Sequence, residues 1–300
     1  MNSLVILLGP TGVGKTELSL QVAERFGSPI ISSDSRQLYK DLPIGTAAPT
    51  PEQMARVKHY MVGTLSLTDY YSASNFEEDV VSLLSELHKT IPTVVMTGGS
   101  MMYIDAVCKG IDDIPTISPE LRTGLMEVYE REGLESIRQM LKELDPVFYG
   151  QVDLNNGKRV LHAVEVCCMA GVPYSSLRKN TPKDRGFRIV RIGLNREREE
   201  LYARIDRRVD LMLEEGLEDE ARRLWPLRHL NALNTVGYKE LFDYFEGKTD
   251  YAEAVRLIKR NSRRYARKQL SWFRRDDDIR WFHPDDYEGI VEAIRLMKIG

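Results

Sequence analysis

The residues with the clearest chemical meaning are Gly9-Pro-Thr-Gly-Val-Gly-Lys-Thr16, close to the start of the chain. They follow the apolar run Leu4–Leu8 and precede a helical pattern over Glu17–Phe26. A glycine-rich loop between a strand and a helix, ending in Lys and Thr, is the P-loop pattern. Its backbone N–H groups and the helix N-terminus form a cradle for clustered anionic oxygens. We expect the loop to bind the phosphates of a ligand, which the loop alone does not identify, and the Thr16 hydroxyl can ligate a phosphate-bridged Mg²⁺. The expected binding residues are Gly9, Pro10, Thr11, Gly12, Val13, Gly14, Lys15 and Thr16.

Asp34 is the second candidate, because it follows the short strand expected at Pro29–Ile31. Ligands of open parallel sheets bind at the carboxyl ends of the strands, so Asp34 is expected beside the P-loop. Its carboxylate can act as a general base, a metal ligand or a helix N-cap. The next buried strand ends in Thr97, where many P-loop ATPases carry a second acid for Mg²⁺. This difference argues against ordinary nucleotide hydrolysis.

Positive charge is concentrated in one late segment, although the whole chain has a net charge of −3. No Asp or Glu occurs from Ala254 to Arg275, and the same window holds nine basic residues. Either this helix has a solvated face or it binds an anionic partner such as a nucleic acid, and the missing acids favour the partner. The basic residues are Arg256, Lys259, Arg260, Arg263, Arg264, Arg267, Lys268, Arg274 and Arg275.

Several nearby residues have more than one interpretation. Tyr265, Trp272 and Phe273 could stack on bases, but packing of Trp272 and Phe273 in the core is favoured. Arg204 and Arg208 are four residues apart on one helix face, where they either reach phosphate or pair with neighbouring acids. The lone histidines His59 and His162 are interpreted as structural or surface residues.

The elements that must position these residues indicate an α/β protein. Strands and helices alternate in the first third, which is typical of a parallel sheet with crossover helices. From residue 113 to 183 helical patterns replace the strands, at Glu120–Arg131, Leu134–Leu144 and Lys158–Met169. We predict a P-loop NTPase-like core over residues 1–112 and 184–300, interrupted by a helical insertion domain over 113–183. The polar stretch 179–186 is expected to be a hinge.

The remaining patterns of the core are a helix at Asn75–Lys89, a strand at Thr93–Thr97 and a helix at Met101–Lys109. After the insertion we expect a strand at Phe187–Ile192, and helices at Arg196–Glu215, Leu217–Leu224 and about Tyr251–Trp272. A final short strand is expected at Ile279–Phe282.

The composition of the chain indicates a protein with a large core and suggests its cellular compartment. The 300 residues are 42% hydrophobic, which is ample for a core, and only three are cysteines. Cys167 and Cys168 are adjacent and lack zinc-site spacing, so we expect a reducing, cytoplasmic compartment. The apolar run at Leu4–Leu8 is too short for a signal peptide or a membrane span, and no membrane partner is expected.

The chain resembles the tRNA dimethylallyltransferases, also called tRNA isopentenyltransferases, over nearly its whole length. Asp-Ser-x-Gln-x-Tyr soon after the P-loop, with Arg-x-Tyr-Ala-x-x-Gln-x-x-Trp-Phe-Arg later, is highly specific for this family. The segments that carry the resemblance are Gly9–Thr16, Asp34–Tyr39, Gly98–Tyr103, Lys158–Glu165, Gly237–Glu240 and Arg263–Arg274.

The resemblance implies transfer of a dimethylallyl group from dimethylallyl diphosphate to N6 of the adenosine just 3′ of the anticodon. The P-loop would then hold a diphosphate leaving group, with Mg²⁺ on Thr16 and with Arg204 or Arg208 stabilising its charge. Asp34 would be the general base, and Ser100 would bind the base edge or order the site. The adenosine must leave its stack to reach this site. The expected partners are dimethylallyl diphosphate and the tRNA anticodon stem-loop, and the protein is expected to be a monomer.

The tRNA contacts are expected both beside the P-loop and in the insertion domain. The residues are Asp34, Ser35, Arg36, Gln37, Ser100, Arg122, Lys158, Arg159, His162, Arg263 and Arg267. The family commonly has Gly-Gly-Thr-Gly-Leu-Tyr where this chain has Gly98-Gly-Ser-Met-Met-Tyr103. It commonly has Asn-Pro-Gln-Arg where this chain has Asn156-Gly-Lys-Arg159, and a basic residue at the position of His162. The reaction class does not depend on these positions.

Two other functions fit parts of the pattern. A small-molecule or nucleotide kinase would use the P-loop and a helical lid, and it would consume ATP without needing the basic helix. A non-catalytic RNA-binding module would bind tRNA and form no product.

Overall fold

The computed structural model describes residues 1–179 and 181–299, and the chain divides into two compact units. The α/β unit consists of Met1–Cys108 and the chain from Asp184 onward, and the helical unit is Lys109–Lys183. The sequence-based boundaries of the insertion were residues 113 and 183. Asn180, in the stretch expected to be a hinge, lies outside the described residues.

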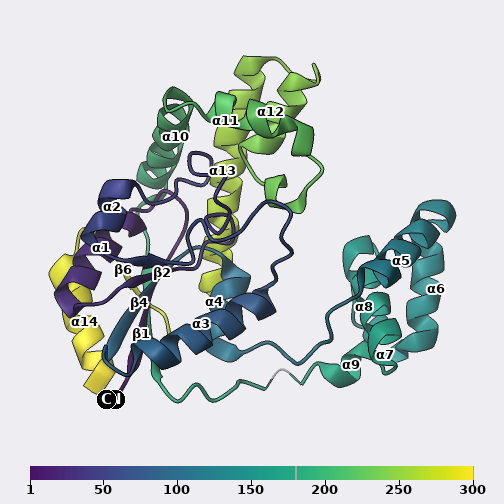
Figure 1. Cartoon of the computed structure of the whole chain (residues 1–300), viewed down its shortest axis with the longest axis horizontal. Coiled ribbons are helices and arrows are strands. Elements are labelled where there is room, and N and C mark those ends of the chain that lie inside the picture. The colour runs from purple at the N-terminus through teal and green to yellow at the C-terminus, as the bar shows by residue number, and fades with distance from the viewer. Residues whose placement is uncertain (180, 300) are drawn as a thin grey trace. The chain divides into compact units, whose positions relative to one another are not determined.

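The α/β unit is built on a six-stranded parallel sheet with the strand order β3-β2-β4-β1-β5-β6 (Figure 1). This confirms the predicted parallel α/β fold. The strands are β1 (Ser3–Leu8), β2 (Ile30–Ser32), β3 (His59–Tyr60), β4 (Thr93–Gly98), β5 (Arg188–Leu194) and β6 (Arg280–Phe282).

Helices cover both faces of this sheet, which is why β1 is a continuous apolar run. Val5 and Leu7 pack towards α1 (Lys15–Phe26) and α14 (Tyr287–Ile299). Leu4, Ile6 and Leu8 pack on the opposite face towards α3 (Ala73–Leu87) and α4 (Met101–Lys109). The two sets of helices lie on opposite sides of the strands in Figure 1. Helix α14 was not predicted from the sequence.

The register of the strands brings their carboxyl ends to one edge. Leu8 of β1 is opposite Gly98 of β4 and Gly193 of β5. Ser32 of β2 is opposite Thr97, and Leu194 of β5 is opposite Phe282 of β6. The segments that follow these five strands therefore meet around the P-loop, which continues from the central strand.

A third layer of helices lies beyond this edge, and its members gather together in Figure 1. They share a core that includes Val209, Leu217, Leu241 and Ile258. The elements are α10 (Arg198–Glu214), α11 (Leu217–Leu224), α12 (Tyr238–Phe245) and α13 (Tyr251–Phe273), with short 3₁₀ turns at Trp225–Leu227 and Asn231–Leu233. Helix α2 (Pro51–Arg56) precedes β3 and begins with a capping box at Thr50.

The helical unit packs around Leu125, Ile137, Leu141, Val160 and Val164. Its helices are α5 (Pro119–Glu132), α6 (Leu134–Leu144), α7 (Pro146–Tyr149), α8 (Gly157–Ala170) and α9 (Tyr174–Leu177). Buried Asp145 accepts hydrogen bonds from the N–H groups of Phe148 and Ser175, and so fixes the starts of α7 and α9. Among the helices that the structure describes, none is long and apolar enough to cross a membrane.

Candidate active site

The carboxyl edge of the sheet opens into a cavity of about 1070 Å³. Residues in or just after the strands of the sheet line its wall, together with helices α10 and α13. Lining residues that the argument uses are Lys15, Thr16, Asp34, Arg196, Arg204, Arg208, Tyr265 and Gln269.

The P-loop forms one side of this cavity. Gly12 and Gly14 have φ angles of 79° and 110°, which other residues rarely adopt. Lys15 folds back over the loop, and its Nζ donates hydrogen bonds to the Gly9 carbonyl at 2.9 Å and the Pro10 carbonyl at 2.8 Å. Burial, with a smaller contribution from the Arg208 cation, lowers the pKa of Lys15 to about 7 against the opposing effect of Asp34. A bound anion would restore the charge of Lys15.

Arg208 and Arg204 reach the loop from α10 and differ in burial. Arg208 is partly buried, its Nη1 donates to Thr11 Oγ1 at 3.1 Å, and loss of solvent around its guanidinium lowers its pKa. Arg204 is exposed, and its Nε donates to the Gly12 carbonyl at 3.0 Å. Neither arginine forms an ion pair with any residue that the structure describes, so the sequence-based alternative of pairing with neighbouring acids is wrong for both.

Asp34 lies on the opposite wall, after β2. Its Oδ1 accepts the N–H of Arg36 at 2.8 Å and more weakly that of Gln37 at 3.4 Å. Within the described part of the chain Oδ2 has no hydrogen-bond partner. Asp34 therefore caps the turn with one oxygen and leaves the other available, so the capping and catalytic interpretations are compatible.

Ser100 supports this turn from the end of β4. Its hydroxyl accepts the N–H of Ser35 at 2.8 Å and lies 3.1 Å from Ser35 Oγ. The side-chain amide of Gln37 also connects neighbouring segments. Its Nε2 donates to the carbonyls of Thr46 and Ala47, and its Oε1 accepts from Ser32 Oγ. These contacts favour an ordering role for both side chains.

The loop that follows Leu42 forms another wall and is fixed by a buried carboxylate. Glu220 on α11 is 2% exposed and accepts the N–H groups of Ile44 at 3.0 Å and Gly45 at 2.8 Å. The hydroxyl of Tyr238 donates to the same carboxylate at 2.6 Å. A buried carboxylate requires such partners, so Glu220 determines where this loop runs.

Gln269 is a site residue that the sequence analysis missed. It projects from α13, is 2% exposed, and connects two strand ends. Its Oε1 accepts the N–H of Thr11 at 2.9 Å, and its Nε2 donates to the Gly99 carbonyl at 2.8 Å. The signal was available, because Ala266, Gln269 and Phe273 recur at the spacing of one buried helix face.

Carboxylates balance more of the positive charge of helix α13 than its sequence indicates. Lys259 pairs with Asp210 at 2.6 Å and Arg263 pairs with Asp206, both on α10, and Arg256 pairs with Glu253 in its own first turn. Arg264 and Arg267 are exposed and form no ion pair among the residues that the structure describes. Only part of the predicted positive face is therefore available to a partner.

The aromatic residues of α13 fall into two groups, those that pack in the core and one that lines the cavity. Phe273 is buried, and Trp272 Nε1 donates to Asp105 at 2.9 Å, so the core interpretation is confirmed for both. Tyr265 instead lines the main cavity, and burial raises its pKa to about 12. Arg36 lies close by, and its Nη1 donates to the Asn231 carbonyl at 3.0 Å.

The helical unit holds the remaining predicted residues. Lys158, Arg159 and His162 are exposed on α8. Arg122 donates to Glu165 at 3.1 Å, and His162 Nδ1 lies 3.4 Å from the same carboxylate. His59, the other lone histidine, lies in β3 with Nδ1 at 2.8 Å from the Val57 carbonyl.

A metal would have few protein ligands here. Among the described residues there is no group of three His, Cys, Asp or Glu side chains that could hold one. Thr16 lines the cavity, and its hydroxyl is an oxygen ligand that fits a Mg²⁺ ion carried mainly by the phosphates of a bound molecule.

Comparisons with known proteins identify the family to which the chain is similar. The family model for IPP transferase matches residues 37–276. A tRNA dimethylallyltransferase 2 of Parabacteroides distasonis is 76% identical over 290 residues, with 97% of both chains covered. A tRNA dimethylallyltransferase 1 of Phocaeicola vulgatus is 59% identical, with 99% of both chains covered.

Solved structures support the same assignment. A tRNA isopentenylpyrophosphate transferase from Bacillus halodurans is 33% identical with a TM-score of 0.72, covering 99% of this chain and 97% of that one. A eukaryotic dimethylallyltransferase acting on tRNA shares the fold with a TM-score of 0.82 at 24% identity, covering 96% of this chain and 75% of that one. On the family model and the two closely similar relatives together, the chain belongs to the IPP transferase family.

Proposed function

We propose that this chain is a tRNA dimethylallyltransferase, which transfers a dimethylallyl group from dimethylallyl diphosphate to N6 of the adenosine immediately 3′ of the anticodon. The observation that carries the proposal is the meeting of two unpaired, partly buried cations, Lys15 and Arg208, with the available Oδ2 of Asp34 in one cavity. The cations suit a leaving diphosphate, and the carboxylate suits a nucleophile that loses a proton.

The reaction balances with these groups. The N6 amine attacks C1 of the prenyl donor, and the electrons of the breaking C–O bond remain on the diphosphate. Lys15, Arg208 and the exposed Arg204 stabilise the developing charge at the P-loop residues Gly9–Thr16. Asp34 takes the N6 proton as general base. Mg²⁺ held by Thr16 and the diphosphate would neutralise further charge on the leaving group.

Two substrates have room to meet at Asp34. A second cavity of about 410 Å³ shares Thr11, Asp34, Arg208, Met212 and Tyr265 with the first. We assign the P-loop cavity to the diphosphate and the shared wall to the reacting atoms, with the ring of Tyr265 available to stack on the extruded adenine. Ser35, Arg36, Gln37 and Ser100 would shape the path of the tRNA.

Contacts with tRNA phosphates would come from exposed cations of both units. In the α/β unit Arg267 is the better placed of the two predicted arginines, because Arg263 is already paired with Asp206. In the helical unit Lys158, Arg159 and His162 are exposed, and Arg122 is oriented by Glu165. Such contacts position the tRNA without reading its sequence. We expect the enzyme to act as a monomer.

The test is a product assay. The protein is incubated with dimethylallyl diphosphate, Mg²⁺ and unmodified tRNA, and nucleosides are analysed by mass spectrometry. Prenylated adenosine next to the anticodon supports the proposal. ATP consumption without that product would favour a kinase, and tRNA binding without any product would favour a binding module.

A further inference from the structure

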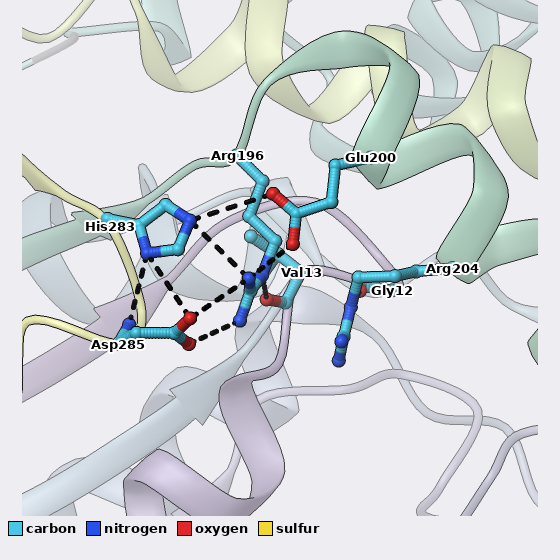
Figure 2. Close-up of polar contacts among 7 residues, drawn as sticks. All are labelled: Gly12, Val13, Arg196, Glu200, Arg204, His283 and Asp285. Carbon is cyan, nitrogen blue, oxygen red and sulfur yellow. Dashed lines mark hydrogen bonds and ion pairs between the residues drawn. The ribbon is translucent and has the colours of Figure 1, made fainter.

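Two consecutive carbonyls of the P-loop accept hydrogen bonds from two arginines that also line the main cavity (Figure 2). Arg204 Nε donates to the Gly12 carbonyl at 3.0 Å, and Arg196 Nε donates to the Val13 carbonyl at 2.9 Å. Arg196 lies between β5 and α10 and was not singled out by the sequence analysis.

The two arginines differ in what their remaining N–H groups do. Arg196 is 7% exposed, and its guanidinium pairs with Glu200 at 2.5 Å and with Asp285 at 2.6 Å. Two carboxylates thus surround one guanidinium, and His283 adds its ring at 3.4 Å. The Nη groups of Arg204 point away from this cluster in Figure 2 and have no partner within the described residues. Arg204 is therefore available to an anion, whereas Arg196 is not.

The contact with Val13 orients the cradle. The carbonyl of Val13 and the N–H of Gly14 belong to one planar trans peptide, so they point in opposite directions. A hydrogen bond that fixes the carbonyl on Arg196 also directs the Gly14 N–H to the other side, away from Arg196. If this peptide rotated, its negative end would face the site where an anion should bind. Glycine on one side of the peptide makes such rotation easy unless a partner prevents it.

Asp285 holds Arg196 from a segment that the sheet itself fixes. Leu194 of β5 is paired with Phe282 of β6, and the N–H of Asn195 donates to the Phe282 carbonyl at 3.0 Å. Asp285 follows three residues later, and its hydrogen bond from Arg196 lowers the pKa of this carboxyl. Asp285 also lies outside residues 37–276, which the family model matches.

We propose that Arg196 is a positioning residue for the diphosphate cradle, held in place by Asp285 and Glu200 and acting through the Val13–Gly14 peptide. The inference rests on the proposed function, because the P-loop must first bind a diphosphate. Arg196 is not expected to touch the substrate, because its charge is balanced within the protein.

The experiment measures binding of inorganic diphosphate with Mg²⁺ by calorimetry, together with KM for each substrate. We expect Arg196→Ala to weaken diphosphate binding about tenfold, as for a charge-assisted hydrogen bond. KM for dimethylallyl diphosphate should rise, while KM for tRNA stays unchanged. Asp285→Asn should weaken binding about threefold. The double variant should be no weaker than Arg196→Ala, because both residues act through one contact.

Arg222→Ala is the matched control. Arg222 pairs with Glu218, four residues earlier on α11, as Arg196 pairs with Glu200 four residues later, but Arg222 does not contact the P-loop. It should bind diphosphate like the wild type. Asp285 is 68% exposed, so Asp285→Asn keeps the test valid if Arg196→Ala does not fold. Wild-type affinity in Asp285→Asn, or fully additive losses in the double variant, would overturn the inference alone. A wild-type protein that binds no diphosphate would overturn the proposed function as well.

Discussion

The cations of the P-loop cavity and those of helix α13 have the same charge in different settings. Lys15 and Arg208 are partly buried, and neither forms an ion pair among the described residues. Lys259 and Arg263 on α13 face α10, where Asp210 and Asp206 balance them. All four side chains are partly buried, so the difference is in pairing: an unpaired cation removed from water costs free energy until an anion binds, whereas the cations of α13 already have carboxylate partners.

This difference teaches that basic residues in a sequence are not the same as available positive charge. The acid-free window of α13 indicated a free cationic face, but acids from α10 and Glu253 balance three of its members. Two partly buried cations of the cavity, Lys15 and Arg208, form no ion pair among the described residues and remain available for a ligand. The following predictions test that contrast, from the largest expected effect to the smallest.

The largest effect should come from the carboxylate that faces the cavity cations. Asp34→Asn keeps an oxygen that can cap the Arg36 N–H but removes the base, so we expect turnover to fall about 10²–10⁴-fold. Affinity for tRNA should stay nearly intact, because Asp34 is only one of the expected tRNA contacts, and affinity for diphosphate should not weaken, because a carboxylate does not attract an anion. Single-turnover kinetics and separate binding measurements check both parts. Turnover near that of the wild type would mean that Asp34 only caps the turn and is not the general base.

Removing a cavity cation should weaken diphosphate binding strongly. We expect Lys15→Ala and Arg208→Ala each to lose about 10–100-fold in affinity, because a charged hydrogen bond contributes about 1.5–3 kcal/mol. The comparison variant is Lys259→Ala, which removes a cation of α13 that is paired with Asp210 of α10. This variant should bind diphosphate like the wild type. Equal losses at Lys15 and Lys259 would contradict the contrast between the two regions.

The pH dependence of diphosphate binding should follow Lys15. Its pKa of about 7 in the free protein means that Lys15 is charged below pH 7 and neutral above it. Affinity should therefore fall as the pH rises, by roughly 20-fold between about pH 6.5 and 8.5. Because diphosphate titrates too, the measure is the difference between wild type and Lys15→Ala in calorimetry. Parallel pH profiles would show that Lys15 keeps its charge throughout.

The smallest effect concerns the salt dependence of tRNA binding. Neutralising Arg267, which is exposed and unpaired among the described residues, should reduce the slope of log K against log salt by about 0.7–0.9. Neutralising Arg263 should change the slope less, because it also releases Asp206. Filter binding over a salt series compares the two variants. If Arg263 carried the larger slope, the pairing seen here would not hold in the complex.

Local patterns predicted most of the fold. The helices at Met101–Lys109, Leu134–Leu144 and Leu217–Leu224 have the bounds that their periodicity indicated. The P-loop and Asp34 were found because each follows a buried strand, and parallel strands bring such ends together. Helix α14 was missed, although Tyr287–Ile299 has an amphipathic pattern.

The rest depends on contacts between distant segments. Nothing near Arg196 indicates that Asp285 will meet it, because the pairing of β5 with β6 brings them together. Asp206 and Asp210 balance α13 only because α10 packs beside it. Gln269 could have been identified as buried, but its partners Thr11 and Gly99 could not. Periodicity predicts which face of a helix is buried, and the partner across the interface requires the structure.

The central claim is that the P-loop holds a leaving group and that the reaction occurs at the adjacent carbon. The most direct test uses dimethylallyl diphosphate labelled with ¹⁸O in the oxygen that bridges C1 and phosphorus. The account predicts that all of the label appears in the released diphosphate, in amounts equal to the prenylated adenosine. Label retained on a prenyl alcohol, with none in the released diphosphate, would mean that the P–O bond breaks and would contradict the account.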